Sequence, residues 1–297
     1  MDKLGFGYDD VKKINSKIIY CSITGFGSEG PYSKRGGFDL IAQGMSGLMS
    51  ITGHPDSPPA KVGVPIADLN TGMFAMQGIL SAYIHRLKKN EGQYMEVSLL
   101  ESALAYTMYE SSIYFTTGKI STPDGSAHRL TAPYQAFKTK DGYINIGAAN
   151  QSNWERLLNV LGLENLNEDP EFSDSKSRQV NRKKLEKKLE KIFISKSSKE
   201  WISMLIENSI PSGPIYNMKQ VWEDEQVKFR KMEVKLDHPK QKNSRNIGVA
   251  VKLSKTPGKI KSPAPLYGEH SKSILKELGY SDEEIDNLIK SNISGMK

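Results

Sequence analysis

Residues 17–31 read KIIYCSITGFGSEGP and place a glycine-rich turn directly after a run of apolar residues. The Ile, Tyr and Cys side chains of the first half are types that favour β-strands. Loops at strand ends commonly carry the functional groups of a protein. The stretch therefore predicts a strand followed by a tight functional loop, and an ordinary glycine-rich turn is the alternative.

The glycines of this turn have the G-x-G-x-x-G spacing of a dinucleotide-binding loop, since they fall at Gly25, Gly27 and Gly30. That motif also needs a helix that opens at the third glycine. Pro31 is acceptable at a helix start, but Gly36 and Gly37 fall where the first helical turns would have to be. The sequence therefore disfavours a dinucleotide site.

The chain has 297 residues and a formal net charge of +7, which raises the question of an anionic partner. Much of the basic excess lies in SRQVNRKKLEKKLEKIF, where Leu185, Leu189 and Ile192 recur at helical spacing. This pattern predicts the solvated face of an amphipathic helix, and no aromatic residues alternate with its lysines. We therefore predict no nucleic-acid partner.

Several other classes are disfavoured by simple counts. The apolar stretch GMFAMQGILSAYI is too short to span a bilayer, and no charged-then-apolar leader is recognisable, so we predict a cytoplasmic protein without a membrane partner. Cys21 is the only cysteine and lies in an apolar run, which favours an inert thiol. The five histidines are scattered without ligand spacing, so no metal site is predicted.

Outward from the opening stretch, helical and extended patterns alternate. We expect a helix from Phe38 to Met49, closed by Gly53, an extended run AKVGVPIAD, a strand GQYMEVSLL, and a helix over ESALAYTMYESSIYF. Between the extended run and that strand, a long helix carries an apolar face made of Leu69, Met73, Met76, Leu80, Ile84 and Leu87. Alternation of this kind predicts an α/β layer.

The second half has a different character. YQAFKTKDGYINIGAA predicts a hairpin with its turn at Asp141-Gly142, and helices follow. Short strands are expected near KMEVKL and IGVAVKL, and a last helix has Ser281 as N-cap with Glu284 in the capping-box position. We therefore divide the chain into a large domain over residues 1–118, a linker at 119–131, a smaller α+β domain at 132–221, and a C-terminal return over 222–297.

One carboxylate stands out by its context. Asp68, in VGVPIADLNTGM, lies where an extended run meets a helix, so that its side chain is at a helix N-terminus. Free N–H groups and the helix dipole favour an ionised carboxylate there. Such a group can serve as a base, a cap or a covalent nucleophile, and from spacing alone a simple cap is the commonest of these roles.

The sequence resembles the class III CoA-transferases, the family of formyl-CoA transferase and crotonobetainyl-CoA:carnitine CoA-transferase. The resemblance lies in ordered blocks that span nearly the whole chain: SITGFGSEGPYSKRGGFDLIAQGMSGLMSITG, VGVPIADLNTGMFAMQGILSAY, GQYMEVSLLESAL, APYQAFKTKDGYINIGAANQSNWERL, IPSGPIYNM and SPAPLYGEHSKSILKELGYSDEEI. It implies that Asp68 attacks an acyl-CoA thioester, and that anhydride and aspartyl-CoA intermediates follow. Coenzyme A is then a substrate, and no permanently bound cofactor is expected.

The resemblance also implies other site residues. Asp39 matches a family position near the carboxylic acid substrate, Phe38 stands beside it, and the loop with Gly25, Gly27 and Arg35 falls on the CoA side. Related α-methylacyl-CoA racemases carry a histidine where this chain has Phe38, which cannot transfer a proton. The phenylalanine favours a transferase over a racemase. SAHRLTAPYQAFKTKDGY is closest to members that use small dicarboxylates such as succinate and glutarate.

The family fold implies a Rossmann-like large domain, a smaller α+β domain and an interlocked homodimer. Family members have a further N-terminal stretch before the block that begins here with MDKLGFGYDDVKKIN. Without it, a sheet edge and apolar helix faces would be exposed. We therefore expect the chain by itself to be poorly stable and inactive, and a non-catalytic homologue remains an alternative.

Overall fold

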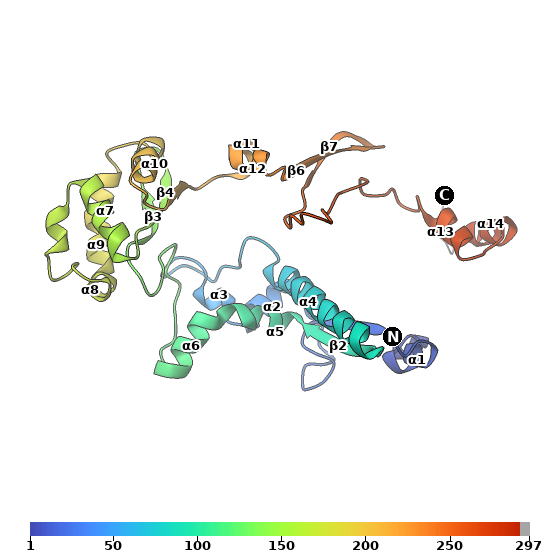
Figure 1. The fold of residues 1–297 in the computed structure, drawn as a ribbon. Helices are drawn as coiled ribbons and strands as arrows, with labels where there is room; N and C mark the ends of the chain where they lie inside the picture. The colour runs from blue at the N-terminus through green and yellow to red at the C-terminus, as the bar shows by residue number, and fades with distance from the viewer. Residues whose placement is uncertain (292–297) are drawn as a thin grey trace. The chain divides into compact units, whose positions relative to one another are not determined.

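The computed structural model describes residues 1–291, which fall into two compact units, Met1–Pro214 and residues 215–291 (Figure 1). Both helices and strands build each unit, so the predicted mixed α/β class is confirmed. The units are described separately below. None of the described helices combines the length and the apolar character needed to cross a bilayer.

The first part of unit 1 is built on two parallel strands, β1 (Ile19–Thr24) and β2 (Gln93–Ser98), whose register pairs Ile19 with Gln93 and Thr24 with Ser98. Short helices precede and follow β1, a long helix leads into β2, and further helices follow β2. They are η1 (Asp2–Leu4), α1 (Tyr8–Ile14), α2 (Asp39–Met45), α3 (Leu48–Ile51), α4 (Ile66–Lys89), α5 (Leu99–Leu104), η2 (Ala105–Thr107) and α6 (Met108–Thr117).

Helix α4 lies along the strand pair through a face of small residues. Ala67, Ala75 and Ala82 are buried, and a Cβ at Gly78 would lie 2.4 Å from Cε of Met95 in β2. Small side chains thus allow the helix to approach the sheet closely. The predicted helix is confirmed, but its large apolar face is left exposed in this chain: Leu69, Met73, Met76, Leu80, Ile84 and Leu87 are all about half exposed or more.

The second part of unit 1 contains the larger core. Strands β3 (Tyr134–Lys138), β4 (Tyr143–Gly147) and β5 (Ser212–Pro214) form an antiparallel sheet. The β3–β4 hairpin turns at the predicted Asp141-Gly142, with Thr139 N donating to Gly142 O at 2.9 Å. The remaining elements are α7 (Gln151–Leu161), η3 (Glu164–Asn167), α8 (Ser175–Val180), α9 (Arg182–Phe193) and α10 (Ser198–Glu207).

This core is closed by aromatic side chains from helices and from the turn before α8. Trp154, Phe172 and Phe193 are fully buried, and the ring of Phe193 packs edge-on against Trp201 with centroids 5.2 Å apart. In contrast, the core beside the parallel strands is made mainly of small and medium residues: Ala42, Leu48, Ala67, Leu99 and Ala103. The predicted amphipathic helix is confirmed, since Leu185 and Leu189 of α9 are buried.

Unit 2 contains a two-stranded antiparallel ribbon of β6 (Glu233–His238) and β7 (Gln241–Ile247). Its helices are α11 (Met218–Glu223), α12 (Glu225–Phe229), α13 (Ser271–Glu277) and α14 (Asp282–Lys290). The predicted capping box of the last helix is confirmed, because Glu284 N donates to Ser281 Oγ at 3.3 Å and Ser281 N donates to the Glu284 carboxylate at 2.8 Å.

Three predicted elements are wrong in their extent. The single helix expected over ESALAYTMYESSIYF is divided into α5, η2 and α6. The expected single helix from Phe38 to Met49 is divided into α2 and α3, because Gly47 adopts a left-handed backbone conformation with φ of +86°. The second C-terminal strand was expected over IGVAVKL, but β7 ends at Ile247, where that segment begins. Strand β7 follows β6 through a tight turn, and most of its residues are polar.

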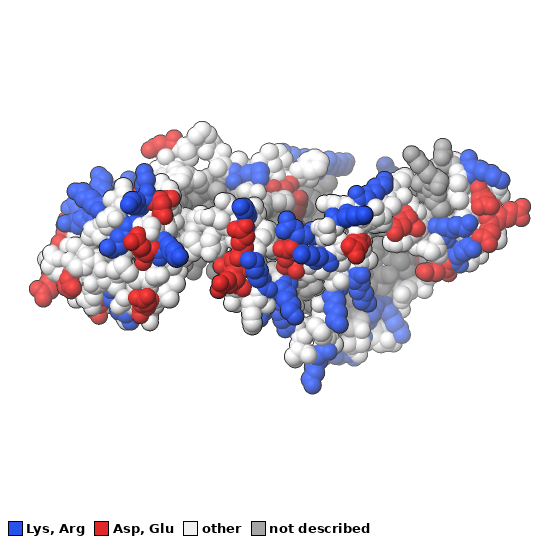
Figure 2. All heavy atoms as spheres, turned by 90° about the horizontal axis from the view of Figure 1, so that it is seen from above, with Lys and Arg blue, Asp and Glu red and all other residues white. Residues whose placement is uncertain are grey.

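Charged side chains of both signs are distributed over the face shown in Figure 2, where lysines and arginines lie among aspartates and glutamates. Within α9 the exposed lysines alternate with Glu186 and Glu190, which are partly buried. This mixture is that of a solvated surface, as the sequence pattern predicts.

Candidate active site

Asp68 lies in the first turn of α4, as predicted, and its carboxylate is exposed. The helix is 24 residues long, begins after Pro65, and has a positive dipole end at this turn. Within residues 1–291, no hydrogen bond or ion pair engages the Asp68 side chain. A carboxylate that is accessible and unengaged is suited to nucleophilic attack.

Asp39 supports the same helix start from another element. It occupies the first turn of α2, and its Oδ1 accepts a hydrogen bond from Ala67 N at 2.9 Å. Its Oδ2 accepts from Gln43 Nε2 at 2.7 Å, and Gln43 Oε1 in turn accepts from Val62 N at 2.9 Å. The carboxylate thereby satisfies one of the free N–H groups of α4.

Gln43 was not singled out by the sequence, although it is fully buried and completes this arrangement. Its signal was a polar side chain four residues after Asp39 in an apolar helical pattern, a spacing at which side chains meet. Because Gln43 also holds Val62, it ties α2 to the extended segment that leads into Asp68. Asp39, Gln43 and the first turn of α4 therefore form one connected structure.

Phe38 is the N-cap residue of α2, and its side chain is 78% exposed. Its carbonyl accepts hydrogen bonds from Ile41 N and Ala42 N at 2.9 and 3.0 Å. The phenyl ring carries no titratable proton, so this position cannot supply the acid or base of a racemase.

The glycine loop, residues 25–30, has a local reason for its glycines. A Cβ on Gly25 would lie 2.8 Å from the Cα of Gly37, so the two backbones cross too closely for side chains. Gly27 has φ of +99°, and its N–H donates to Thr24 Oγ1 at 2.8 Å. The next N–H, of Ser28, donates to the carboxylate of Glu96 in β2.

Arg35 follows the glycine loop and is held by aromatic rings. Its guanidinium lies 4.5 Å from the ring centre of Tyr32 and 5.4 Å from that of Phe26, and the two rings pack edge-to-face. This arrangement orients the Arg35 cation through its contacts with aromatic faces. Among the described residues, no hydrogen bond or ion pair joins Arg35 or the glycine loop to Asp68.

Two further findings bear on the chemistry. Burial raises the pKa of the Cys21 thiol, which disfavours the reactive thiolate form. No cluster of three or more potential metal-ligating side chains is present in the described part of the chain.

Comparison with known proteins places this site in context. The model of CoA-transferase family III matches residues 1–271. Succinyl-CoA:glutarate CoA-transferase of Mus musculus is 38% identical over 294 residues, which cover 99% of this chain and 67% of the mouse protein. Succinate--glutarate CoA-transferase of Agrobacterium fabrum is 33% identical over 276 residues, 93% of this chain and 69% of that protein.

A solved structure agrees with the sequence comparison. The crystal structure of a CAIB/BAIF family protein from Brucella suis has a TM-score of 0.80 and 34% identity, and covers 93% of this chain and 72% of its own. The chain spans about two thirds of the length of the mouse relative. With a family model matched over residues 1–271 and relatives above 30% identity, the chain belongs to CoA-transferase family III.

Proposed function

We propose that this protein moves coenzyme A from an acyl-CoA to a carboxylic acid, with Asp68 as the covalent nucleophile. Membership of the family supports the reaction class. The observation that carries the assignment of Asp68 is its accessible carboxylate in the first turn of α4, which no hydrogen bond or ion pair engages within residues 1–291. Asp39 is already committed to hydrogen bonds with Ala67 and Gln43, which leaves Asp68 as the available carboxylate of this pair.

In the proposed sequence, an Asp68 oxygen attacks the thioester carbonyl, the C–S bond breaks, and CoA thiolate leaves an aspartyl-acyl anhydride. The thiolate then attacks the Asp68 carbonyl, which releases the donor as a carboxylate and forms an aspartyl-CoA thioester. The acceptor carboxylate displaces the thiolate to form a second anhydride. Attack of the thiolate on the acceptor carbonyl gives the new acyl-CoA and restores Asp68. Both kinds of intermediate hydrolyse, so the site has to exclude water.

For the substrates, we propose a small dicarboxylic acid as acceptor and a dicarboxylic acyl-CoA as donor. The similarity to proteins named as succinyl-CoA:glutarate transferases supports this class. On the CoA side we propose the glycine loop with Gly25 and Gly27, and the guanidinium of Arg35, which lies against two aromatic rings and makes no ion pair with a carboxylate of the described residues. We propose that Phe38 borders the reacting thioester from the start of α2.

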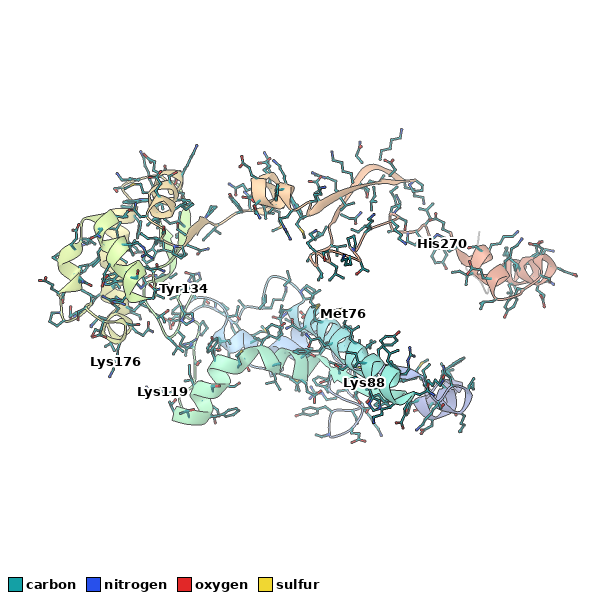
Figure 3. The ribbon with its side chains drawn as sticks, in the orientation of Figure 1. Met76, Lys88, Lys119, Tyr134, Lys176 and His270 are labelled. Atoms are coloured by element: carbon teal, nitrogen blue, oxygen red, sulfur yellow. The ribbon has the colours of Figure 1, made fainter. Side chains whose placement is uncertain are left out.

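For the assembly, we propose a homodimer whose large domain is Rossmann-like. The apolar face of α4 is exposed and includes Met76 (Figure 3). It supports the homodimer, because a second protein surface would cover it. Isolated apolar side chains are normal on a protein surface, but a continuous helical stripe of them marks an interface. The cytoplasmic location stays a prediction.

The direct test is an assay of the full-length gene product that contains residues 1–297. Succinyl-CoA and glutarate are the first substrate pair, and formation of glutaryl-CoA is followed by mass spectrometry. Uptake of solvent deuterium at the α-carbon of an acyl-CoA without an acceptor acid would instead indicate the racemase. Absence of both reactions over a range of acyl-CoA donors would contradict an enzymatic role.

A further inference from the structure

The side of the β1–β2 pair opposite α4 carries polar and aromatic side chains. The register places Tyr20 beside Tyr94 and Ser22 beside Glu96, and the two tyrosine rings stack with centroids 5.9 Å apart. Alternation along the strand puts Tyr94 and Glu96 on one side, while Met95 faces α4. Glu96 is thus a carboxylate on an open strand face rather than part of the core.

Glu96 contacts the glycine loop through both carboxylate oxygens. Oε1 accepts from Ser28 N and from Thr24 Oγ1, the latter at 3.3 Å, and Oε2 accepts from Ser28 Oγ at 2.5 Å. Tyr94 OH donates to the same Oε2 at 3.2 Å. The hydroxyl of Ser28 lowers the pKa of Glu96, opposed in part by desolvation, so the group is ionised at neutral pH.

These contacts determine what the loop can bind. Successive N–H groups of a glycine loop form a concave site for anions such as phosphate. Here the N–H of Gly27 is taken by Thr24 and the N–H of Ser28 by Glu96, so the anion position is filled by the protein's own carboxylate. A phosphate placed there would meet a like charge at short range. The loop is therefore a fixed wall rather than a phosphate cradle.

We propose that Glu96 is a positioning residue, which holds the glycine loop in the shape required for productive binding of the acyl-CoA. The inference rests on the proposed function in that the loop borders the acyl-CoA. The other part of the proposal, that Glu96 fixes the shape of the glycine loop, depends only on the contacts described above. Both Ser28 and Thr24 belong to the segment that the carboxylate holds.

The test compares Glu96→Gln with wild type in the full-length gene product. Glutamine keeps the size but loses the charge that accepts several hydrogen bonds, and we expect KM for acyl-CoA to rise about fivefold or more while kcat stays within about twofold. Ser28→Ala is expected to raise KM in the same direction and to be non-additive with Glu96→Gln, because the two residues share one interaction. Glu96→Asp is expected to restore part of the loss.

Glu91→Gln is the matched control, since it removes the same charge from an exposed residue near the start of β2. If Glu96 acted only by repelling the anionic CoA, Glu96→Gln would lower KM, and if it were a bystander KM would not change. Either result would overturn the proposal.

A second readout does not depend on activity. Hydrogen exchange of the Gly27 and Ser28 amides is expected to accelerate several-fold in Glu96→Gln and to stay at the wild-type rate in Glu91→Gln. Unchanged exchange in Glu96→Gln would contradict the positioning role even if the enzyme were active. Accelerated exchange in a protein without transferase activity would instead leave the loop assignment standing and reject the proposed function.

Discussion

Asp68 and Asp39 lie at the starts of two helices and have different surroundings. Asp39 is held by the N–H of Ala67 and the amide of Gln43, whereas Asp68 is exposed and unengaged within the described residues. At the start of α4, Asp39 thus supports the backbone, and Asp68 is left available for chemistry. This difference leads to separable effects on substitution.

Asp68→Asn is expected to reduce turnover at least about a thousandfold, because the amide is a poor nucleophile and cannot form the anhydride. The free energy of unfolding should change little, since the Asp68 side chain has no hydrogen-bond or ion-pair partner to lose within residues 1–291. Turnover with succinyl-CoA and glutarate, together with a thermal melt, measures both quantities. Residual activity within tenfold of wild type would reject Asp68 as the nucleophile.

Asp39→Ala is expected to lower the free energy of unfolding by about 1 kcal/mol, the usual cost of losing a helix cap. Activity should fall as well, because the first turn of α4 carries Asp68. Chemical denaturation gives the stability change. Unchanged stability with lost turnover would instead assign Asp39 directly to the chemistry.

At the scale of elements, the crossing of Gly25 and Gly37 determines the base of the glycine loop. Gly25→Ala is expected to destabilise the protein by about 1–3 kcal/mol, because the added Cβ would overlap the Gly37 backbone. Gly36→Ala is the matched control, as a Cβ there meets nothing within 4 Å and its φ is not positive. Thermal melts of both variants test the expectation, and equal effects would contradict it.

The segment between α6 and β3 is held by ion pairs. Arg182 in α9 donates to both oxygens of Asp124 at 2.7 and 2.5 Å, and Arg129 donates to Glu110 in α6 at 3.2 Å. Arg182 lowers the pKa of Asp124, and Arg129 adds to this effect. Neither arginine was singled out from the sequence, because partners so far apart along the chain leave no local pattern.

This pairing predicts a pH dependence of stability. A carboxyl with a lowered folded pKa stabilises the fold fully above its ordinary value of about 3.9, and the stabilisation is lost as the pH falls through the folded pKa. Asp124→Asn is therefore expected to be less stable than wild type by about 1–3 kcal/mol at pH 7 and to converge with it in strong acid. A difference that is independent of pH would contradict the role of the charge.

Comparison of these elements shows what a sequence can predict. The hairpin at Asp141-Gly142 and the Ser281 capping box were predictable because neighbouring residues determine them. The break at Gly47 was missed because an apolar period continues across it. Asp68 was found from its context and the family resemblance, whereas Glu96 and Gln43 act through contacts distant in sequence. The assigned domain boundaries stay predictions.

At the scale of the whole molecule, the apolar stripe of α4 is the main surface left to explain. Leu80→Glu is expected to disrupt assembly, because it places a charge on the exposed apolar face. Ser81→Glu adds the same charge at an exposed polar position of the same helix, to the side of the stripe, and serves as the control. Light scattering after size exclusion is expected to show a dimer for wild type and Ser81→Glu and a smaller species for Leu80→Glu. A monomeric wild type would contradict the proposed dimer.

The central claim is that CoA transfer proceeds through the carboxyl of Asp68, and covalent trapping tests it most directly. The full-length gene product is incubated with succinyl-CoA and treated with hydroxylamine, which converts an activated carboxyl to a hydroxamate, and its peptides are analysed by mass spectrometry. We expect a hydroxamate on Asp68 that requires the acyl-CoA and is absent from Asp68→Asn. An enzyme that turns over without modification of Asp68, or with the hydroxamate on another carboxyl, would contradict it.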